Sequence, residues 1–430
     1  MIKLIPEEIL AIYNKIQNAG FEVYLVGGCV RNMLLKKPVK DWDMTTNAIP
    51  DDLLKIFKEG FYDNKFGTVG VPLLTQEYGR MIVEITTFRT EKSYSDKRRP
   101  DKVEWGKSIE EDLARRDFTI NAIALSLATS IIDPFNGQRD IKDRLIRAVG
   151  NPKERFKEDA LRLLRAIRIA TEHSFTIEEK TWNEIVSDAK LITEVSGERI
   201  RIELLRILAS DYPYEGIILL KNANLLNYIL PELIEGIGIS QARLGRHHKD
   251  DVFTHNVLSL KFCPSTDPIV RLAALLHDVG KPKVMSKDKE DLVIFHNHEV
   301  AGANIARNIC ARLKFSKKER DKIVNLIRWH MFTVDEKLSD AGIRRFIRRI
   351  GVENVKDMMD LRIGDRLGGG TQTAESWRLK LFKKRIEDQL KPLPFSINDL
   401  TIDGNDIMKE LKIKPGPKIG DILNKLFLEV

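Results

Sequence analysis

Two aspartates that flank a single tryptophan carry the most specific chemistry in this sequence. Residues two apart on a β-strand point to the same face of the sheet, so the carboxylates of Asp41 and Asp43 can reach one place. Paired oxygen ligands of this kind suit a hard divalent cation such as Mg²⁺. We therefore expect Asp41 and Asp43 to be catalytic residues that hold Mg²⁺.

A pair of glycines upstream of the aspartates supplies a place for phosphate groups. The apolar run 23–26 predicts a strand that ends at Gly27 and Gly28, and residues 29–35 can continue as a helix. Glycine lets the backbone come close to a triphosphate, the start of a helix attracts anions, and Arg31 can pair with phosphate oxygens. Together with the aspartates, this arrangement indicates metal-dependent nucleotidyl transfer.

The interpretation depends on the order of these motifs and on later ones, because an Asp-x-Asp or a Gly-Gly pair alone is common in turns and loops. The later motifs are Arg-Arg-Asp-Phe-Thr-Ile-Asn-Ala at 115–122, Asp-Pro-Phe-Asn-Gly at 133–137, an arginine-rich stretch at 158–168 and Gly-Glu-Arg-Ile at 197–200. This series resembles the class II tRNA nucleotidyltransferases, which include CCA-adding enzymes and bacterial poly(A) polymerases. The resemblance covers roughly residues 20–240. It implies that Gly28, Arg31 and Arg116 bind the triphosphate.

The segment 158–170 predicts one helix on which charged residues recur every three positions. These residues are Asp159, Arg162, Arg165 and Arg168. An Asp and an Arg one turn apart offer an acceptor and a fork of donors, which suits the Watson–Crick edge of a base. The resemblance implies that Asp159 and Arg162 select the base, and Arg165 and Arg168 would then be phosphate or structural contacts. The alternative is an exposed helix with intrahelical ion pairs.

The segment 88–101 and the residue Glu84 each leave alternatives open. The polar segment 88–101 predicts a mobile loop near the triphosphate. In the resembling family such a loop accompanies addition of the terminal A, which argues against an enzyme limited to adding C. Glu84, on the apolar strand expected at 81–86, is either a third carboxylate near the metal or a structural residue of the sheet.

Histidines and aspartates on several predicted helices form a second group in the other half of the chain. His277 and Asp278 end an apolar helical run, and His255 lies in the helix expected before it. Imidazoles and carboxylates from different helices can converge on one or two metal ions inside a bundle. With Asp365, these residues resemble the four positions that name the HD phosphohydrolase domain.

The HD resemblance implies a divalent metal whose identity the sequence does not give. His298 and His330 match the positions that are used when a second metal is bound. Such a centre would activate water and neutralise a phosphoester. The alternative is a degenerate domain kept as a helical scaffold, in which backbone carbonyls satisfy the histidines.

Composition fits a globular protein of several domains that binds nucleic acid. The chain has 430 residues, 43% of them hydrophobic, and its net charge of +8 with basic clusters favours a polyanion such as RNA. Three scattered cysteines form no disulfide framework, which indicates a reducing compartment. Without a signal-peptide core or a bilayer-spanning stretch, we expect a cytoplasmic protein with no membrane partner. The oligomeric state is left open.

The periodicity of the chain predicts its fold class. We expect an α/β head of short strands and helices, followed by a mainly α-helical chain. The resemblances imply that the head is a polymerase-beta-like nucleotidyltransferase with a mixed sheet and helices, and that a neck, an HD bundle and a tail follow it. The expected boundaries are 1–150 for the head, 151–245 for the neck and body with nucleotide-selecting and RNA-binding elements, 246–370 for the HD domain and 371–430 for the tail.

Function follows from both halves together. We expect a tRNA nucleotidyltransferase that adds CCA to the tRNA 3′ end from CTP and ATP without a nucleic-acid template, with an HD domain of phosphohydrolase activity. A poly(A) polymerase or an A-adding enzyme of the same family is one alternative. An HD nucleotide phosphohydrolase with a vestigial RNA-binding head is another, although the intact Asp-x-Asp argues against a vestigial site.

Overall fold

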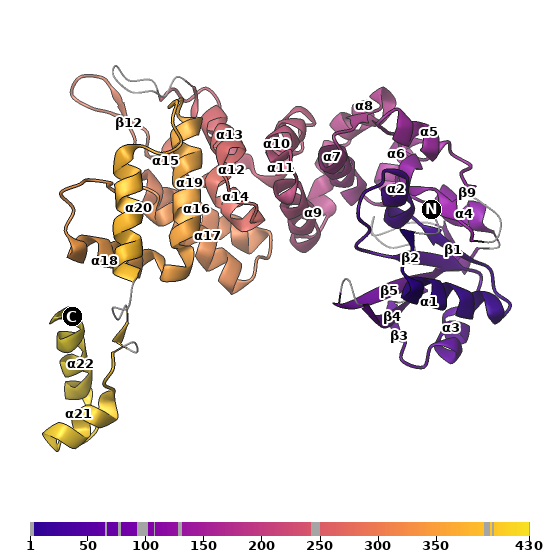
Figure 1. Cartoon of the computed structure of the whole chain (residues 1–430). Helices are drawn as coiled ribbons and strands as arrows, with labels where there is room; N and C mark the ends of the chain where they lie inside the picture. Colours follow the sequence, from indigo (N-terminus) through magenta and orange to yellow (C-terminus); the bar gives the residue numbers. More distant parts are fainter. Residues whose placement is uncertain are drawn as a thin grey trace. The chain divides into compact units, whose positions relative to one another are not determined.

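The computed structural model forms two compact units, Met1–Ile229 and Leu230–Val430 (Figure 1). It describes residues 4–64, 67–75, 79–92, 102–106, 108–127, 131–241, 250–390, 396–397 and 400–429. None of the helices described in these ranges has the length and apolar character that a membrane crossing requires.

A mixed sheet of seven strands organises the first unit, as the sequence predicts. Its order is β3-β4-β5-β2-β1-β8-β9, and only β2 and β5 are parallel among its neighbouring pairs. The strands are β1 (Val23–Val26), β2 (Asp43–Thr46), β3 (Phe61–Asn64), β4 (Thr68–Thr75), β5 (Gly79–Thr87), β8 (Ala124–Leu125) and β9 (Ile131–Ile132). The parallel register sets Asp43 opposite Glu84.

Helices surround this sheet and continue beyond it. They are α1 (Glu7–Asn18), α2 (Gly28–Leu34), α3 (Pro50–Ile56), α4 (Ile109–Ala114), α5 (Gly137–Lys142), α6 (Pro152–Glu158), α7 (Leu161–His173), α8 (Glu179–Ser187), α9 (Gly197–Ala209), α10 (Pro213–Asn222) and α11 (Leu226–Ile229). A two-stranded pair, β10 (Leu145–Ile146) and β11 (Thr176–Ile177), lies among them. A buried apolar cluster joins Val26 at the end of β1 to Leu113 of α4. This packing holds the glycine pair near the arginines that follow α4.

The loop expected at 88–101 is in part a β-ribbon. β6 (Arg89–Lys92) pairs antiparallel with β7 (Lys102–Trp105), so the prediction of a loop was wrong for residues 89–92. The backbone hydrogen bonds of this ribbon supply the order that apolar periodicity did not indicate. Residues 93–101 lie outside the described part of the chain.

The helix expected at 158–170 is two helices with a break at Asp159. This residue is extended, with φ −145° and ψ 103°, and the backbone N–H of Leu161 donates to its Oδ1 at 3.1 Å. A short acidic side chain competes in this way with the helical backbone. Asp159 and Arg162 therefore do not lie one turn apart on a single helix, which corrects the prediction.

The second unit is a helical bundle, with a short hairpin of β12 (Ser286–Lys287) and β13 (Val293–Ile294). Its helices are α12 (Pro231–Ile234), α13 (Val252–Phe262), α14 (Pro268–Leu276), α15 (Lys281–Val284), α16 (His298–Arg312), α17 (Lys317–Trp329), α18 (Asp340–Ile350), α19 (Val355–Gly368), α20 (Trp377–Leu390), α21 (Gly404–Leu411) and α22 (Pro417–Glu429). Figure 1 shows α13, α14, α16, α17 and α19 side by side. This agrees with the mainly helical second half that was predicted.

Two glycines allow α13 and α19 to pack backbone against backbone. A Cβ atom on Gly364 would lie 2.4 Å from the carbonyl oxygen of Ser259, and one on Gly368 would lie 2.7 Å from its nitrogen. Positions four apart share one helix face, so both glycines meet the same neighbour. The close approach brings Asp365 of α19 to 3.3 Å from His255 Nε2 of α13.

We expect Gly364→Ala to lower the free energy of unfolding of the second unit by about 1–3 kcal/mol, since the added methyl group forces the two backbones apart. Chemical denaturation followed by circular dichroism measures the change. Gly420→Ala is the matched control, because nothing lies within 4 Å of a Cβ placed there and alanine favours the helix. Equal stability of Gly364→Ala and the wild type would contradict the packing argument.

Candidate functional site

A polar cavity of about 710 Å³ lies in the first unit, beside the glycine pair and β2. It is lined by every residue that the sequence predicts for nucleotide and Mg²⁺ binding in the head. These residues are Gly28, Arg31, Asp41, Asp43, Arg116, Asp159, Arg162, Arg165 and Arg168. Glu84 lines it too, so the position of Glu84 fits a third carboxylate rather than a purely structural residue.

The carboxylates reach the cavity by a route that differs in part from the prediction. β2 begins at Asp43, and Asp41 precedes the strand. Trp42 between them is only 2% exposed, so it points into the core while both aspartates line the cavity. Burial raises the pKa of Asp43, Arg116 opposes this shift and the neighbouring Asp41 adds to it. Carboxylates held together in this way fit a hard cation such as Mg²⁺.

The glycine turn sits directly against Arg116. Gly27 has φ +73°, which favours glycine, and a Cβ there would lie 2.9 Å from Arg116 Nη1 and 3.7 Å from Asp43 Oδ2. Arg116 Nη2 donates to Asp112 Oδ2 at 3.1 Å. Its buried Nε has no hydrogen-bond partner in the described part of the chain. A buried donor without a partner at a cavity indicates a place for an anionic ligand.

Polar contacts connect two more arginines of the cavity, Arg31 and Arg165, to the motif at 115–122. Arg31 Nη1 donates to Asn121 Oδ1 at 2.6 Å, and Asn121 Nδ2 donates to Asp117 Oδ1 at 3.0 Å. Arg165 Nη2 lies 2.8 Å from Asp117 Oδ2. The sequence did not single out Asp112, Asp117 or Asn121, although all three lie in or beside its arginine motif. They position the arginines that it did single out.

The two residues expected to select the base are both held by neighbours. Arg199 donates to Asp159 through Nη1 at 3.0 Å and through Nη2 at 2.7 Å. Arg162 donates to Glu158 Oε2 at 2.5 Å and to the carbonyl oxygen of Arg115 at 3.0 Å. Arg199 belongs to the 197–200 motif, whose role the sequence did not indicate.

The last predicted arginine of the cavity is held by carboxylates. Arg168 Nε donates to Glu203 Oε2 at 2.5 Å, and its Nη1 donates to Glu172 Oε2 at 2.6 Å. The side chain of Arg168 is buried. Its two carboxylate partners fix Arg168 in place, which fits the structural contact that the sequence left as one alternative.

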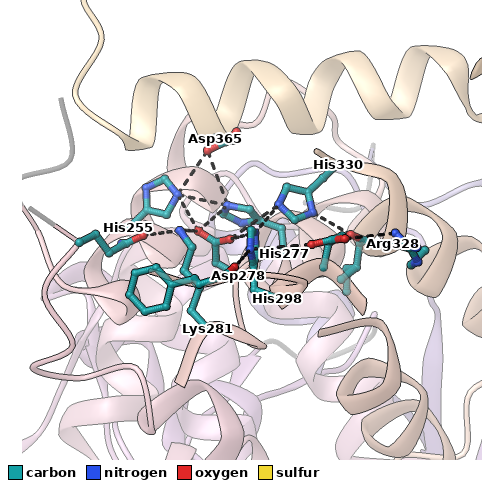
Figure 2. Close-up of polar contacts among 12 residues, drawn as sticks. His255, His277, Asp278, Lys281, His298, Arg328, His330 and Asp365 are labelled. Atoms are coloured by element: carbon teal, nitrogen blue, oxygen red, sulfur yellow. Dashed lines mark hydrogen bonds and ion pairs between the residues drawn. The ribbon is translucent and has the colours of Figure 1, made fainter. Parts of the chain in front are cut away.

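A carboxylate lies at the centre of the group of histidines in the second unit (Figure 2). Asp278 Oδ2 is 3.3 Å from Nε2 of His255 and 3.3 Å from Nε2 of His277. Its other oxygen, Oδ1, is 3.2 Å from His298 Nε2 and 3.7 Å from His330 Nε2. All six residues predicted for this centre, Asp365 included, therefore come together, with Asp278 between two pairs of imidazoles.

Hydrogen bonds fix the ring orientation of three of these histidines. The Nδ1 atoms of His277, His298 and His330 lie 2.9, 2.8 and 2.7 Å from backbone carbonyl oxygens. A neutral ring that donates from Nδ1 presents the lone pair of Nε2. Nε2 of His298 lies 3.3 Å from Nε2 of His330, so two lone pairs face each other. A cation between such nitrogens removes the repulsion.

The two carboxylates of the cluster, Asp278 and Asp365, also favour positive charge near them. Burial on its own lowers the pKa of His277, but Asp278 and Asp365 outweigh burial and raise it to about 10. The pKa of Asp278 is held well below its usual range, because His277 and Lys281 outweigh the effect of burial. Mixed imidazole and carboxylate donors fit a first-row transition metal better than Mg²⁺.

A cavity of about 320 Å³ opens onto this cluster. Lys281 lines the cavity and pairs with Asp278, and Arg362 Nη1 donates to Asp365 Oδ2 at 2.9 Å. The exposed His296 lines it as well, and the sequence did not single it out. The arrangement places cationic side chains beside the imidazole and carboxylate cluster, where an anion can bind.

Three family models match the chain. The Poly A polymerase head domain matches residues 23–147, the Probable RNA and SrmB-binding site of polymerase A matches 174–236, and the HD domain matches 244–380. Among curated relatives, a CCA-adding enzyme from Ligilactobacillus salivarius is 32% identical and covers 100% of this chain and 94% of its own length. One from Pediococcus pentosaceus is 31% identical and covers 99% and 93%.

Solved structures of similar fold span nearly the whole chain. The crystal structure of the Bacillus stearothermophilus CCA-adding enzyme in complex with CTP is 25% identical, with a TM-score of 0.68, and covers 98% of this chain and 91% of its own. The Thermotoga maritima CCA-adding enzyme complexed with tRNA is 20% identical, with a TM-score of 0.58, and covers 100% and 92%. The second likeness concerns the fold alone.

We expect Asp365→Asn to weaken Co²⁺ binding at the imidazole cluster at least about tenfold, because it removes one carboxylate donor. The intensity of the visible Co²⁺ absorption during titration of the full chain measures this affinity. Asp360→Asn on the same helix is the control, since its carboxylate pairs with Lys356. An unchanged affinity in Asp365→Asn, or an equal loss in both variants, would count against the metal centre.

Asp112 gives a prediction about pH. Burial raises its pKa, but Arg115 and Arg116 outweigh burial and hold the pKa below its usual range, so its stabilising effect is present at neutral pH and lost as the pH falls through the folded-state pKa. We expect Asp112→Asn to lower the free energy of unfolding at pH 7 by about 3 kcal/mol. This difference from the wild type should shrink below about pH 4.

Urea denaturation of both proteins at pH 7, 5, 4 and 3 measures that difference. Asp143→Asn serves as the control, because the pair of Asp143 with Arg139 is exposed to solvent and its loss should change little at any pH. A difference between Asp112→Asn and the wild type that stays constant across the series would refute the charge argument.

Proposed function

The chain belongs to the family of the CCA-adding enzymes, so its activity is addition of CCA to tRNA, and we propose that the cavity of the first unit carries it out. The observation that carries the proposal is the meeting of Asp41, Asp43 and Glu84 with a set of arginines in one cavity. Carboxylates suit a metal, and arginines suit a triphosphate. The substrates are CTP, ATP and the tRNA 3′ end.

In the proposed mechanism, catalysis is positioning plus neutralisation of charge. Gly28, Arg31 and Arg116 bind the triphosphate, with the unpartnered Nε of Arg116 as one donor. Asp41 and Asp43 hold Mg²⁺, which when bound neutralises charge at the triphosphate and the attacking oxygen. The 3′-hydroxyl oxygen of the tRNA forms a bond to the α-phosphorus, its proton passes to solvent water, and the bond between the α-phosphorus and the pyrophosphate oxygen breaks.

Selection of C and A follows from the chemistry of Asp159 and Arg162. The Watson–Crick edges of cytosine and adenine both place an amino donor next to a ring-nitrogen acceptor, whereas guanine and uracil place a carbonyl acceptor next to an N–H donor. A carboxylate beside a guanidinium matches the first order and not the second. Asp159 is paired with Arg199 and Arg162 with Glu158, so a base must share or replace these partners.

For the second unit we propose metal-dependent phosphohydrolase activity at the cluster around Asp278. His255, His277, Asp278 and Asp365 would hold one metal, and His298 and His330 would hold a second with Asp278 between them. The metal, when bound, supplies activation of water and polarisation of a phosphoester. Lys281 lies beside Asp278, where its ammonium group can bind a phosphate oxygen.

The division into parts is proposed as well. Residues 1–150 would be the head, 151–245 the neck and body, 246–370 the HD domain and 371–430 the tail. The matched ranges 23–147 and 244–380 support the first and third of these parts.

Incorporation of labelled CTP and ATP into tRNA transcripts that lack three, two or one terminal nucleotides tests the transferase. We expect addition to stop after C, C and A. Addition of A to the CC-ended transcript alone would indicate an A-adding enzyme, and unlimited A a poly(A) polymerase. Asp41→Ala with Asp43→Ala should abolish incorporation and leave tRNA binding largely intact. Asp51→Ala is an exposed control that should stay active.

Asp278→Asn tests the phosphohydrolase. We expect hydrolysis of phosphoesters by the Mn²⁺-loaded protein to be lost, because the variant removes the central carboxylate, while CCA addition is retained. Rates of phosphate release and of nucleotide incorporation are measured on the same preparation. Loss of both activities to the same extent would mean that the bundle has only a structural role.

A further inference from the structure

An aromatic cavity of about 290 Å³ lies beside the proposed phosphohydrolase site. Its walls come from α17, α18, α20 and the segment after α17. The aromatic residues that line it are Trp329, Phe332, Phe346 and Phe382. Neither the proposed nucleotidyl transfer nor the proposed phosphoester hydrolysis uses this cavity.

Three phenylalanines of the cavity pack against one another. The ring centroids of Phe332 and Phe346 are 4.8 Å apart, those of Phe332 and Phe382 are 5.6 Å apart, and those of Phe346 and Phe382 are 5.3 Å apart. Flat aromatic faces of this kind stack with nucleic-acid bases and tolerate any base, since every base has a π-face.

Two arginines of α18 add positive charge to the same cavity. Arg345 and Arg349 line it and are exposed, and no carboxylate pairs with either in the described ranges. The guanidinium of Arg349 stands 5.1 Å from the ring centroid of Trp329. Arginines beside aromatic rings suit a ligand that combines a flat ring with acceptor groups.

The aromatic cavity adjoins the metal centre. Met331 lines both cavities. Arg362 joins them, because it donates to Asp365 on one side while its guanidinium carbon lies 5.5 Å from the ring centroid of Phe332 on the other. A single ligand can therefore contact both, with the flexible side chain of Met331 at the boundary.

Two buried donors on the metal side have no partner in the described part of the chain. They are Nε of Arg362 and Nε2 of Gln241, and both residues line the cavity of the metal centre. Gln241 is only 7% exposed. Buried donors without a partner are rare and indicate a missing acceptor, for which phosphate oxygens are well suited.

We propose that the two cavities form one nucleotide site, in which a phosphoester lies at the metal centre and its base stacks in the aromatic cavity. The inference rests on the proposed phosphohydrolase function and names its substrate class, a nucleotide either free or at an RNA 3′ end. In the reaction, the oxygen of water forms a bond to phosphorus, the bond from phosphorus to the ribose oxygen breaks, and that oxygen takes a proton.

Steady-state kinetics of the full-length, Mn²⁺-loaded protein test the inference with two probes. Guanosine 3′-monophosphate carries a base that the transferase site should reject, and β-glycerophosphate carries none. We expect Arg345→Ala and Phe346→Ala each to raise KM for the nucleotide about tenfold with kcat unchanged, and to leave β-glycerophosphate hydrolysis unchanged. Arg348→Ala, an exposed residue of the same helix outside the cavity, is the matched control.

The outcomes separate this inference from the function on which it rests. An equal effect on both probes, or no effect of Arg345→Ala on either, overturns the base site. If the wild type hydrolyses neither probe, the phosphohydrolase proposal fails. The affinity for guanosine 3′-monophosphate, measured by calorimetry on the wild type and on Arg345→Ala, then tests the base site alone. Binding weakened about tenfold in Arg345→Ala supports the base site. Equal binding in both proteins overturns it.

A short RNA that ends in guanosine 3′-phosphate distinguishes the two sources of the nucleotide. Hydrolysis of this RNA with the same dependence on Arg345 supports the base site with an RNA end as its occupant. The same dependence for the free nucleotide alone supports it with a free nucleotide as its occupant.

Discussion

Both sites hold together groups that repel one another, a repulsion that a bound cation would offset. In the first unit, the parallel register of β2 and β5 sets Asp43 opposite Glu84, and burial of Asp43 beside Asp41 raises its pKa, which means that its negative charge is disfavoured there. In the second unit, imidazole lone pairs face one another around Asp278. The hydrogen bonds and backbone contacts of the fold oppose this repulsion, so the rest of each unit serves to keep the sites assembled.

The arginines of the first cavity need negatively charged partners, since each must stay charged and in place when no nucleotide is bound. Asp112 and Asp117 hold Arg116 and Arg165, and Asp159 is held by Arg199. Partners of this kind fix geometry while leaving some donors open to the cavity. Exchange of these partners for a base and a triphosphate can couple nucleotide binding to a change in side-chain positions.

Much of the fold and of both sites could be predicted from the sequence, and the errors share a cause. The mixed sheet, the helical second half and the gathering of predicted residues in one cavity of the first unit and one cluster of the second agree with the structure. The helix expected at 158–170 failed because Asp159 bonds to local backbone, and the loop expected at 88–101 failed over residues 89–92 because these pair with the next strand, β7. Periodicity reports which side of an element is apolar and not which bonds its backbone makes.

The sequence by itself determined the chemistry: the types of donor and acceptor, their order along the chain, and therefore the family. The tertiary structure alone decided the partners. Arg199 reaches Asp159 across 40 residues, and only the contact of two glycines with α13 brings Asp365 to His255. Such pairs form because packing closes long stretches of chain, and the distances that result depend on every element between them.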